Sequence, residues 1–313
     1  MYLVCGEALY DLFAGDGSQP DQFSIEARAG GSPFNVAIGI SRLSGNSALL
    51  TGVSNDLLGQ RLVSMLKRES VSTEYLVRSG NRTTLSLVGI EPDGQPNYVF
   101  YGLGSADCSL EAVELPNIGN DISALHFGSY SLVVKPVADA FSKLLHTCGD
   151  RFVSVDPNVR LNVEPEIDIW RERILEYAGK ANLLKISVED LESLYPKTSK
   201  ESKAADWISQ GIDLVIVTDG GNAVSAWSKS SETAYITPRA AKVVDTVGAG
   251  DSFQAALLYR LAKSGKGDPL AAIRALDADG LSELLSFCAA AAAVTCERRG
   301  ANLPTLSDLK TRR

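Results

Sequence analysis

The chain has 313 residues, of which 45% are hydrophobic and 22% are charged. This composition is typical of a globular protein with a large core and excludes a disordered or fibrous chain. Its 30 Lys and Arg against 38 Asp and Glu give a formal net charge of −8. Because nucleic acids and anionic membranes are bound through clustered cations, this charge argues against a partner of either kind.

No run approaches the roughly 18 consecutive apolar residues that a transmembrane helix needs. The most apolar stretch, residues 288–296, is short and rich in alanine, and we expect a buried helix there. The N-terminus lacks the basic and small-residue segments of a secretory signal. We therefore expect a cytoplasmic protein.

The cysteines and histidines exclude two further classes of protein. Five widely spread cysteines provide neither a disulfide framework nor a CxxC metal site, so we expect reduced, structural thiols. With only His126 and His146, a histidine-rich metal site is also excluded.

Short apolar runs bounded by turn residues alternate along the chain with segments of helical periodicity. The predicted strands are residues 2–5, 48–53, 124–127, 152–155, 182–186 and 213–218. The predicted helices are residues 34–43, 57–68, 137–148, 169–178, 204–210, 252–262 and 281–295. This alternation predicts an α/β fold, a mostly parallel sheet with helices on both faces.

Two segments, about residues 12–29 and 83–104, break this alternation. In both, polar and apolar residues alternate around turn signals at residues 15–17 and 92–94, which predicts antiparallel strands with a solvated face. We expect a small β-structure apart from the main sheet. Because it would be marginally stable alone, it should pack over a ligand or against a second subunit. Surface hairpins are the alternative.

The strongest local signal is the run from Val243 to Phe253, in which an apolar entry and a glycine-rich turn precede a helix. Such a turn presents free backbone N–H groups and the positive end of the helix dipole, which together bind anions. Asp251 at this point either caps the helix or accepts a proton from a hydroxyl beside the anion, and the pattern alone favours the cap. The run lacks the lysine of a Walker A loop, and Phe253 replaces the third glycine of a dinucleotide fingerprint.

Two other segments carry polar groups suited to a ligand. Gly30 and Gly31 precede a helix that contains Asn35, whose amide can both donate to and accept from sugar-like hydroxyls. Asp11 follows the first predicted strand, close to the edge where open α/β sheets bind ligands. Taken singly, each segment also fits an ordinary turn.

Seven segments together have the sequence motifs of a known family, in the same order along the chain. They are Gly6-Glu7-Ala8-Leu9 with Asp11, Gly30-Gly31 with Asn35, residues 52–59 with Asp56, Asp156-Pro-Asn158-Val-Arg160, Lys185-Ile-Ser-Val-Glu-Asp190, Thr218-Asp-Gly-Gly221 and Asp245-Thr-Val-Gly-Ala-Gly-Asp251. On these segments the chain resembles the PfkB family of ribokinase-like carbohydrate kinases, and within it the bacterial fructokinases most closely. The resemblance spans essentially the whole chain.

The resemblance implies a single ribokinase-like domain, residues 1–313, with a three-layer αβα core. Residues 12–29 and 83–104 would form a β-sheet lid that closes over a sugar and excludes water. The implied activity is that of an ATP-dependent sugar kinase, with the conversion of D-fructose to fructose 6-phosphate as the favoured reaction. An exposed lid edge also favours a homodimer.

The resemblance also implies roles for individual residues. Asp251 would be the catalytic base, and the amides of Gly248, Ala249 and Gly250 would stabilise charge on the transferring phosphoryl group. The implied sugar-binding residues are Asp11, Gly30, Gly31, Asn35 and Arg160. The implied ATP-binding residues are Lys185, Ser187, Thr218, Gly220 and Gly221.

Two cations are implied in the same way. The family's Asn-x-x-Glu motif organises Mg²⁺ and the phosphates, and its equivalent here, Ser187-Val-Glu-Asp190, differs at both ends. The shorter carboxylate of Asp190 can still act on Mg²⁺ through water, although a solvated helical turn is the alternative. Many members also bind a monovalent cation such as K⁺ through main-chain carbonyls. The matching residues are Asp245, Val247, Thr295, Arg298 and Gly300.

Other functions remain open for this sequence. The same fold serves 2-keto-3-deoxygluconate kinases, ribokinases and nucleoside kinases. A sugar acid needs extra cations in the pocket, and a nucleoside needs an aromatic platform. Few cations lie in the predicted lid, with Arg28 and Arg82 near its edges, which favours a neutral sugar. Tyr98, Phe100 and Tyr101 could shape either kind of pocket. A non-catalytic sugar-binding regulatory protein is the alternative from a different class.

Overall fold

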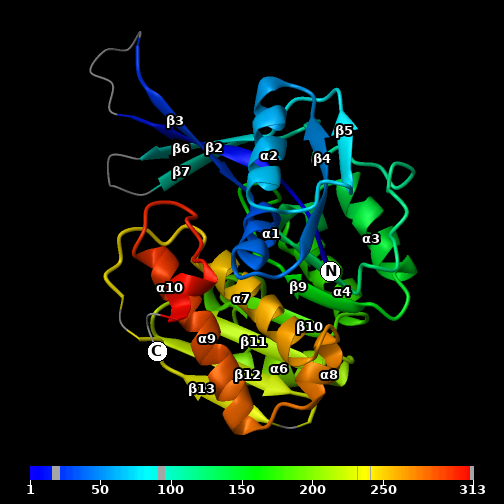
Figure 1. The fold of residues 1–313 in the computed structure, drawn as a ribbon, viewed down its shortest axis with the longest axis vertical. Coiled ribbons are helices and arrows are strands. Elements are labelled where there is room, and N and C mark those ends of the chain that lie inside the picture. The colour runs from blue at the N-terminus through cyan, green and yellow to red at the C-terminus, as the bar shows by residue number, and fades with distance from the viewer. Residues whose placement is uncertain (16–21, 91–95, 231, 240, 311–313) are drawn as a thin grey trace.

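A nine-stranded sheet runs through the centre of the computed structural model, which describes residues 1–15, 22–90, 96–230, 232–239 and 241–310 (Figure 1). Its strand order is β13-β12-β11-β10-β9-β8-β1-β4-β5. The strands are β1 (Tyr2–Cys5), β4 (Ser47–Ser54), β5 (Leu76–Ser79), β8 (Ala124–Gly128), β9 (Phe152–Asp156), β10 (Leu183–Ser187), β11 (Leu214–Asp219), β12 (Ala223–Ser228) and β13 (Thr233–Ile236). From β5 to β11 every neighbouring pair is parallel, whereas β12 and β13 add antiparallel strands at one edge.

Helices cover both faces of this sheet. One face carries α1 (Ser32–Arg42), α2 (Leu57–Arg68), α7 (Ala249–Ser264), α8 (Pro269–Arg274), α9 (Ala278–Cys296) and α10 (Leu306–Lys310). The other carries α3 (Val137–Thr147), α4 (Ile167–Ala178), α5 (Val188–Leu194) and α6 (Lys200–Ser209). Because side chains alternate along a strand, Tyr2 and Val4 of β1 enter the first core, and Leu3 and Cys5 enter the second. The predicted αβα fold is confirmed.

Helix α9 contains the apolar run of residues 288–296 and confirms the helix predicted at residues 281–295, which it extends at both ends. Its 19 residues are long and apolar enough to cross a membrane by length and composition alone, which holds for no other helix in the described parts of the chain. In the fold, however, it packs along α7, and Leu281, Leu285 and Cys288 lie fully buried in the core. Its apolar character is therefore explained by packing inside a globular domain.

A separate four-stranded sheet projects from the main domain, at the upper left of Figure 1. Its strands are β2 (Leu9–Ala14), β3 (Ile25–Gly30), β6 (Leu85–Ile90) and β7 (Pro96–Tyr101), in the order β3-β2-β6-β7. The small separate sheet is thus confirmed, but β2 pairs with β6 in parallel rather than antiparallel fashion. The predicted turn signals at residues 16–17 and 92–94 lie outside the described residues.

Several elements were not predicted, for identifiable reasons. Strands β5 and β13 have four residues each and lie at the two edges of the sheet. Strand β12, next to β13, is built mostly from small and hydroxyl-bearing residues rather than a strong apolar run. Helix α7 begins at Ala249 instead of residue 252, because the glycine-rich turn passes directly into the helix. Helices α5, α8 and α10 have too few residues for a clear helical period.

Candidate active site

The predicted site residues gather where the parallel strands end. Asp156 is the last residue of β9, Ser187 is the last residue of β10, and Thr218 is the direct neighbour of Ser187 on β11. The first turn of α7 approaches the same edge, since a Cβ atom added to Gly250 would lie 3.4 Å from the Lys185 Nζ. Ligands of open α/β folds bind at this edge.

Asp251 is buried and is held by helix α1. Its Oδ1 accepts a 2.7 Å hydrogen bond from the Ser32 hydroxyl, and its Oδ2 accepts a 2.8 Å bond from the Asn35 amide nitrogen. The residue that caps α7 is Gly248, and Asp251 lies inside the first turn. The cap that the pattern favoured for Asp251 is therefore wrong, because its carboxylate is directed at another helix.

The electrostatic surroundings of Asp251 act in opposite directions. Burial raises the pKa of its carboxyl group, while the hydrogen bonds from Ser32 and Asn35 lower it. The positive charge of Lys185 also lowers this pKa, and the negative charge of Asp156 raises it. A buried carboxyl group with a raised pKa binds a proton more tightly, so its ionised form is suited to accept one.

The turn before α7 has the shape of an anion-binding site. Gly248 has φ of +79°, and a Cβ atom there would lie 2.7 Å from that of Ala301, so no other residue fits without rearrangement. The N–H of Ala249 donates a 3.2 Å bond to the Thr246 carbonyl oxygen. The remaining N–H groups of a first helical turn lack acceptors within the helix, so the amides of Gly250 and Asp251 are suited to bind an anion.

Lys185 and Asp156 form a buried ion pair beside this turn. Lys185 Nζ donates a 2.7 Å hydrogen bond to Asp156 Oδ2, and the two side chains are 5% and 3% exposed. Asp190 lies within electrostatic reach: burial and the charge of Asp156 raise its pKa to about 6, against the opposing charges of Arg160 and Lys185. The positive charge of Lys185 on β10 thus lies within reach of two carboxylates, Asp156 on β9 and Asp190 on α5.

Carboxylate oxygens are the ligands that Mg²⁺ prefers, so Asp190 and Asp156 fit the donor set for this ion. In the described part of the chain, no group of three or more His, Cys, Asp or Glu side chains could hold a metal ion by itself. A magnesium ion here would therefore depend on water and ligand oxygens for most of its coordination, as it commonly does in phosphate-binding sites.

The residues predicted to bind ATP divide into two kinds. The Ser187 hydroxyl accepts a 3.0 Å hydrogen bond from the N–H of Asp190 and thereby caps α5. After β11 the chain turns at Gly220, which has φ of +44°, and at Gly221, and a Cβ atom at either would meet no atom within 4 Å. This turn leaves open space that a ligand can approach, whereas Ser187 already has a structural partner.

On the small sheet, Asp11 of β2 is paired in register with Arg28 of β3 and Ser86 of β6, so the three side chains share one face. Burial raises the pKa of Asp11 to about 6, and the charge of Asp251 adds to this effect. A Cβ atom at Gly30 would lie 2.7 Å from Asp11 Oδ2. The carboxylate of Asp11 therefore lies over the glycines that precede α1.

Arg160 is exposed and donates hydrogen bonds to the carbonyl oxygens of Asn158 and Val159. Its charge lowers the pKa values of both Asp11 and Asp190, which belong to the sugar side and the phosphate side of the predicted site. Arg160 thus lies within electrostatic reach of both sides.

The five residues matched to a monovalent-cation site also come together. Asp245 accepts hydrogen bonds from the N–H groups of Gly300, at 2.7 Å, and Val247, at 3.0 Å. The N–H of Arg298 bonds to the Thr295 carbonyl oxygen at 3.0 Å. Hydrogen bonds therefore hold the loop before α7 against the segment that follows α9.

Ser32, Asp156 and Glu7 belong to this site but were not predicted as site residues. Glu7 is buried, its Oε1 accepts a 3.1 Å bond from the N–H of Ser32, and burial raises its pKa to about 8. Asp156 ends a parallel strand, and Ser32 directly follows Gly31. Both positions could have been noticed by the strand-end and glycine-turn rules that identified their neighbours.

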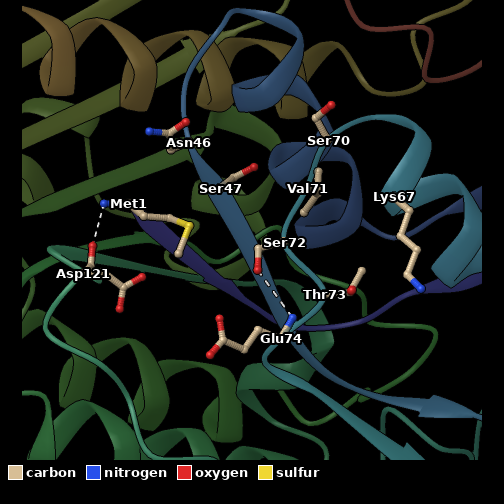
Figure 2. Close-up of a pocket in the computed structure, with 10 residues that line it drawn as sticks. All are labelled: Met1, Asn46, Ser47, Lys67, Ser70, Val71, Ser72, Thr73, Glu74 and Asp121. Carbon is tan, nitrogen blue, oxygen red and sulfur yellow. Dashed lines mark hydrogen bonds between the residues drawn. The ribbon is translucent and has the colours of Figure 1, made fainter.

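A cavity of about 800 Å³ lies at the opposite edge of the sheet, near the first residues of β1 and β4 (Figure 2). Its lining includes Lys67, Ser72, Thr73 and Glu74. Figure 2 shows that the lining side chains are mostly polar and that the Met1 nitrogen is hydrogen-bonded to the Asp121 carbonyl oxygen. None of the predicted site residues lines this cavity, so it is separate from the site at the carboxyl edge.

Comparisons with known proteins agree with the fold. The family model described as "pfkB family carbohydrate kinase" matches residues 1–308. A fructokinase of Rhizobium leguminosarum bv. trifolii is 34% identical over 83% of this chain and 79% of its own length. Probable fructokinase-4 of Arabidopsis thaliana is 34% identical over 90% of this chain and 86% of its own length.

Solved structures are similar along almost the entire chain. Fructokinase with bound ATP from Xylella fastidiosa has a TM-score of 0.88 at 25% identity, covering 99% of this chain and 96% of that one. A double mutant of fructokinase from Vibrio cholerae O395, in fructose, ADP and potassium ion bound form, has a TM-score of 0.83 at 27% identity, covering 99% and 97%.

Proposed function

This chain belongs to the pfkB family of carbohydrate kinases, and from that membership we propose that it is a fructokinase, which transfers the γ-phosphoryl group of ATP to D-fructose and yields fructose 6-phosphate. The observation that carries the chemistry is the position of Asp251. Its buried carboxylate lies at the start of α7, next to amides that are suited to bind an anion, and is held by α1. A base and a phosphate site are thereby adjacent.

In the proposed reaction, the C6 hydroxyl of fructose gives its proton to Asp251, and its oxygen forms a bond to the γ-phosphorus. The bond from that phosphorus to the bridging oxygen breaks, and ADP leaves. The amides of Gly248, Ala249 and Gly250 stabilise charge on the phosphoryl group, with Ala249 releasing its bond to Thr246. Phosphoryl transfer relies on positioning and charge stabilisation, so Asp251 need not be a strong base.

ATP is proposed to lie along the ends of β10 and β11. The open turn at Gly220 and Gly221 supports this placement, as does the buried Lys185, which supplies a cation next to the first turn of α7. Mg²⁺ would be held by Asp190 through water and would neutralise phosphate charge. Ser187 contributes through the cap of α5, and Thr218 through its place at the end of β11.

The sugar is proposed to bind between the small sheet and the glycines before α1. Asp11 accepts hydrogen bonds from sugar hydroxyls, Gly30 and Gly31 permit close approach, and Asn35 offers its amide beside the base. Arg160 provides a positive charge near both the hydroxyls and the phosphoryl group. The small sheet acts as the lid.

The pocket's other groups favour a neutral sugar over an acid or a nucleoside. Arg28 is 2.8 Å from Glu26 and stacks over Phe13, so its charge is already paired. Phe100 packs edge-on against Tyr130, with ring centroids 5.0 Å apart, and is thereby oriented within the protein instead of offering a free platform. Fructokinases are among the relatives at 34% identity.

The loop before α7 is proposed to bind K⁺ through main-chain carbonyl oxygens of Asp245, Val247, Thr295, Arg298 and Gly300. The hydrogen bonds of Asp245 support this, because they hold the two segments together at the anion-binding turn. A cation there would increase the positive potential of that turn.

A homodimer through the lid is proposed as well. Ile25, Val99 and Tyr101 are 47%, 43% and 59% exposed, and the strand registers place all three on the face opposite Asp11. A second copy could cover these apolar side chains. Light scattering after size-exclusion should give the dimer mass, and a strict monomer at micromolar concentration would contradict this.

Five free cysteines, four of them buried, fit a cytoplasmic location.

The experiment that tests the function measures ATP consumption with Mg²⁺ against fructose, other hexoses, pentoses, nucleosides and 2-keto-3-deoxygluconate. Fructose should give the highest kcat/KM. A stronger signal on another sugar would overturn the substrate while keeping the kinase chemistry. Sugar binding without any ATP consumption would instead support the non-catalytic regulatory protein.

A further inference from the structure

Ser32 is fixed from two directions at the start of α1. Its backbone N–H donates a 3.1 Å hydrogen bond to the buried Glu7 carboxylate, and its hydroxyl donates a 2.7 Å bond to Asp251 Oδ1. Only 8% of Ser32 is exposed. The preceding Gly31 has φ of +104°, and a Cβ atom there would lie 2.8 Å from the Glu7 carbonyl oxygen, so the turn leading to Ser32 is also tightly defined.

The bond from Ser32 has two chemical consequences for Asp251. A hydroxyl that donates to a carboxylate stabilises its ionised form, which is the form that can accept a proton. Each carboxylate oxygen can accept more than one hydrogen bond, so a substrate hydroxyl can still donate to Oδ1 while Ser32 stays bound. Ser32 and Asn35 together also restrict both oxygens, and therefore the rotation of the carboxylate.

We propose that Ser32 is a positioning residue, which orients the Asp251 carboxylate and keeps it ready to accept the proton of the sugar hydroxyl. The inference rests on the proposed role of Asp251 as the base. It assigns Ser32 to the reacting carboxylate instead of to the sugar, although Ser32 adjoins the glycines that are proposed to bind sugar.

The other charges around Asp251 come from three strands. Lys185 of β10 lowers its pKa and Asp156 of β9 raises it, while Asp11 of β2 and Asp251 each experience the other's negative charge. A substitution at Ser32 leaves all three groups in place. Any change in the pH dependence of catalysis in such a variant therefore reports the lost hydroxyl.

The test compares Ser32→Ala with the matched control Ser41→Ala. Ser41 lies near the other end of the same helix. Its hydroxyl donates to the Glu69 carbonyl oxygen and makes no bond to Asp251. For Ser32→Ala we expect kcat to fall about tenfold while the KM for fructose changes less than about twofold. The acid limb of the kcat profile should move up by roughly half to one pH unit, because the ionised base has lost a donor. Ser41→Ala should change neither value.

Ser32→Cys provides a second variant of similar shape with a much weaker donor. It should show a shift of the acid limb in the same direction, even if Ser32→Ala is poorly folded. A raised KM with unchanged kcat and pH profile would overturn the inference and make Ser32 a sugar contact. Unchanged kinetics in both variants would overturn it too. If Asp251→Asn retains activity, the proposed base is wrong, and that result is separate from any effect at Ser32.

Discussion

Lys185 Nζ lies 2.7 Å from Asp156 Oδ2, and this ion pair joins two neighbouring parallel strands at the edge where the site forms. A charge left alone in the protein interior is costly, so the two side chains depend on each other. Lys185 also lies beside Gly250, so the same side chain neutralises Asp156 in the sheet and adds positive charge to the anion-binding turn.

Removing one member of this pair should therefore be strongly destabilising. Lys185→Met leaves Asp156 buried without its partner, and we expect the free energy of unfolding to fall by about 3–5 kcal/mol. Urea denaturation measures this. Lys185→Met combined with Asp156→Leu should cost less than the sum of the two single changes, because no unpaired charge remains.

The exposed pair between Arg171 and Asp168 is the matched control. Its side chains are 40% and 83% exposed, so Asp168→Asn, at the more exposed member, should cost less than about 1 kcal/mol. The Lys185 and Asp156 double variant should remain folded and still have a much lower kcat. Full kcat in that variant would show that Lys185 has no part in phosphoryl transfer.

Asp11→Asn should increase stability and weaken sugar binding. Burial raises the pKa of Asp11 from about 3.8 to about 6, so the folded chain binds its proton more tightly than the unfolded chain does. In the wild type this group therefore lowers stability as the pH rises from about 4 to 6, and the cost persists at pH 7. The neutral amide avoids that cost, which we set at about 1 kcal/mol after allowing for solvent screening.

Melting curves at pH 4 and pH 7 test the Asp11→Asn prediction. The variant should be more stable than the wild type at pH 7, and the difference should shrink toward pH 4. The KM for fructose should rise at least tenfold. A destabilised variant with an unchanged KM would contradict both the burial effect and the sugar contact.

Much of the main fold follows from local sequence patterns. The strand at Tyr2–Cys5 was predicted with its observed bounds, because a short apolar run before a glycine is a strong local signal. Strands β12 and β13 could not be predicted in the same way, since Trp227 and Tyr235 gain their packing only when the antiparallel edge has formed. The parallel pairing of β2 with β6 is likewise a long-range contact that local alternation does not encode.

Two glycines should respond differently to alanine. At Gly248, alanine meets both a positive φ and the Ala301 side chain, so Gly248→Ala should lower stability by about 2 kcal/mol or more and abolish activity. At Gly221 there is open space and no positive φ, so Gly221→Ala should fold normally. Its expected effect is a several-fold rise in the KM for ATP, because a methyl group would lie where the nucleotide is proposed to bind.

Gly80→Ala is the control for Gly221→Ala, since a Cβ atom at Gly80 also meets nothing within 4 Å. It should leave both the melting temperature and the KM for ATP unchanged. An unchanged KM for ATP in Gly221→Ala as well would place the nucleotide elsewhere.

The proposed K⁺ site predicts a specific salt effect. Potassium chloride should raise kcat relative to choline chloride at equal ionic strength. In Asp245→Asn the bonds to Gly300 and Val247 are weakened, so this activation should be largely lost. Equal rates in both salts for the wild type would exclude a functional K⁺ site. Asp268→Asn, which weakens two bonds from backbone N–H groups at the start of α8, serves as the control and should retain the activation.

The site was predictable to the extent that its residues belong to local motifs. The motif from Gly248 to Asp251 predicts an anion-binding turn by itself, but the role of Asp251 depends on contacts from α1. Ser32 and Asp251 are far apart in the sequence, and only the packing of α1 on α7 brings them within hydrogen-bond distance. For the same reason the sequence pattern favoured a helix cap, which is the local role of such a residue.

The central claim is that Asp251 is the base of a fructose kinase, and Asp251→Asn tests it most directly. The amide keeps the size of the side chain but cannot accept the proton of the sugar hydroxyl. Phosphorylation of fructose by ATP should fall by at least a thousandfold, while fructose binding measured by calorimetry stays within about tenfold of the wild type. Turnover within tenfold of the wild type would contradict the account.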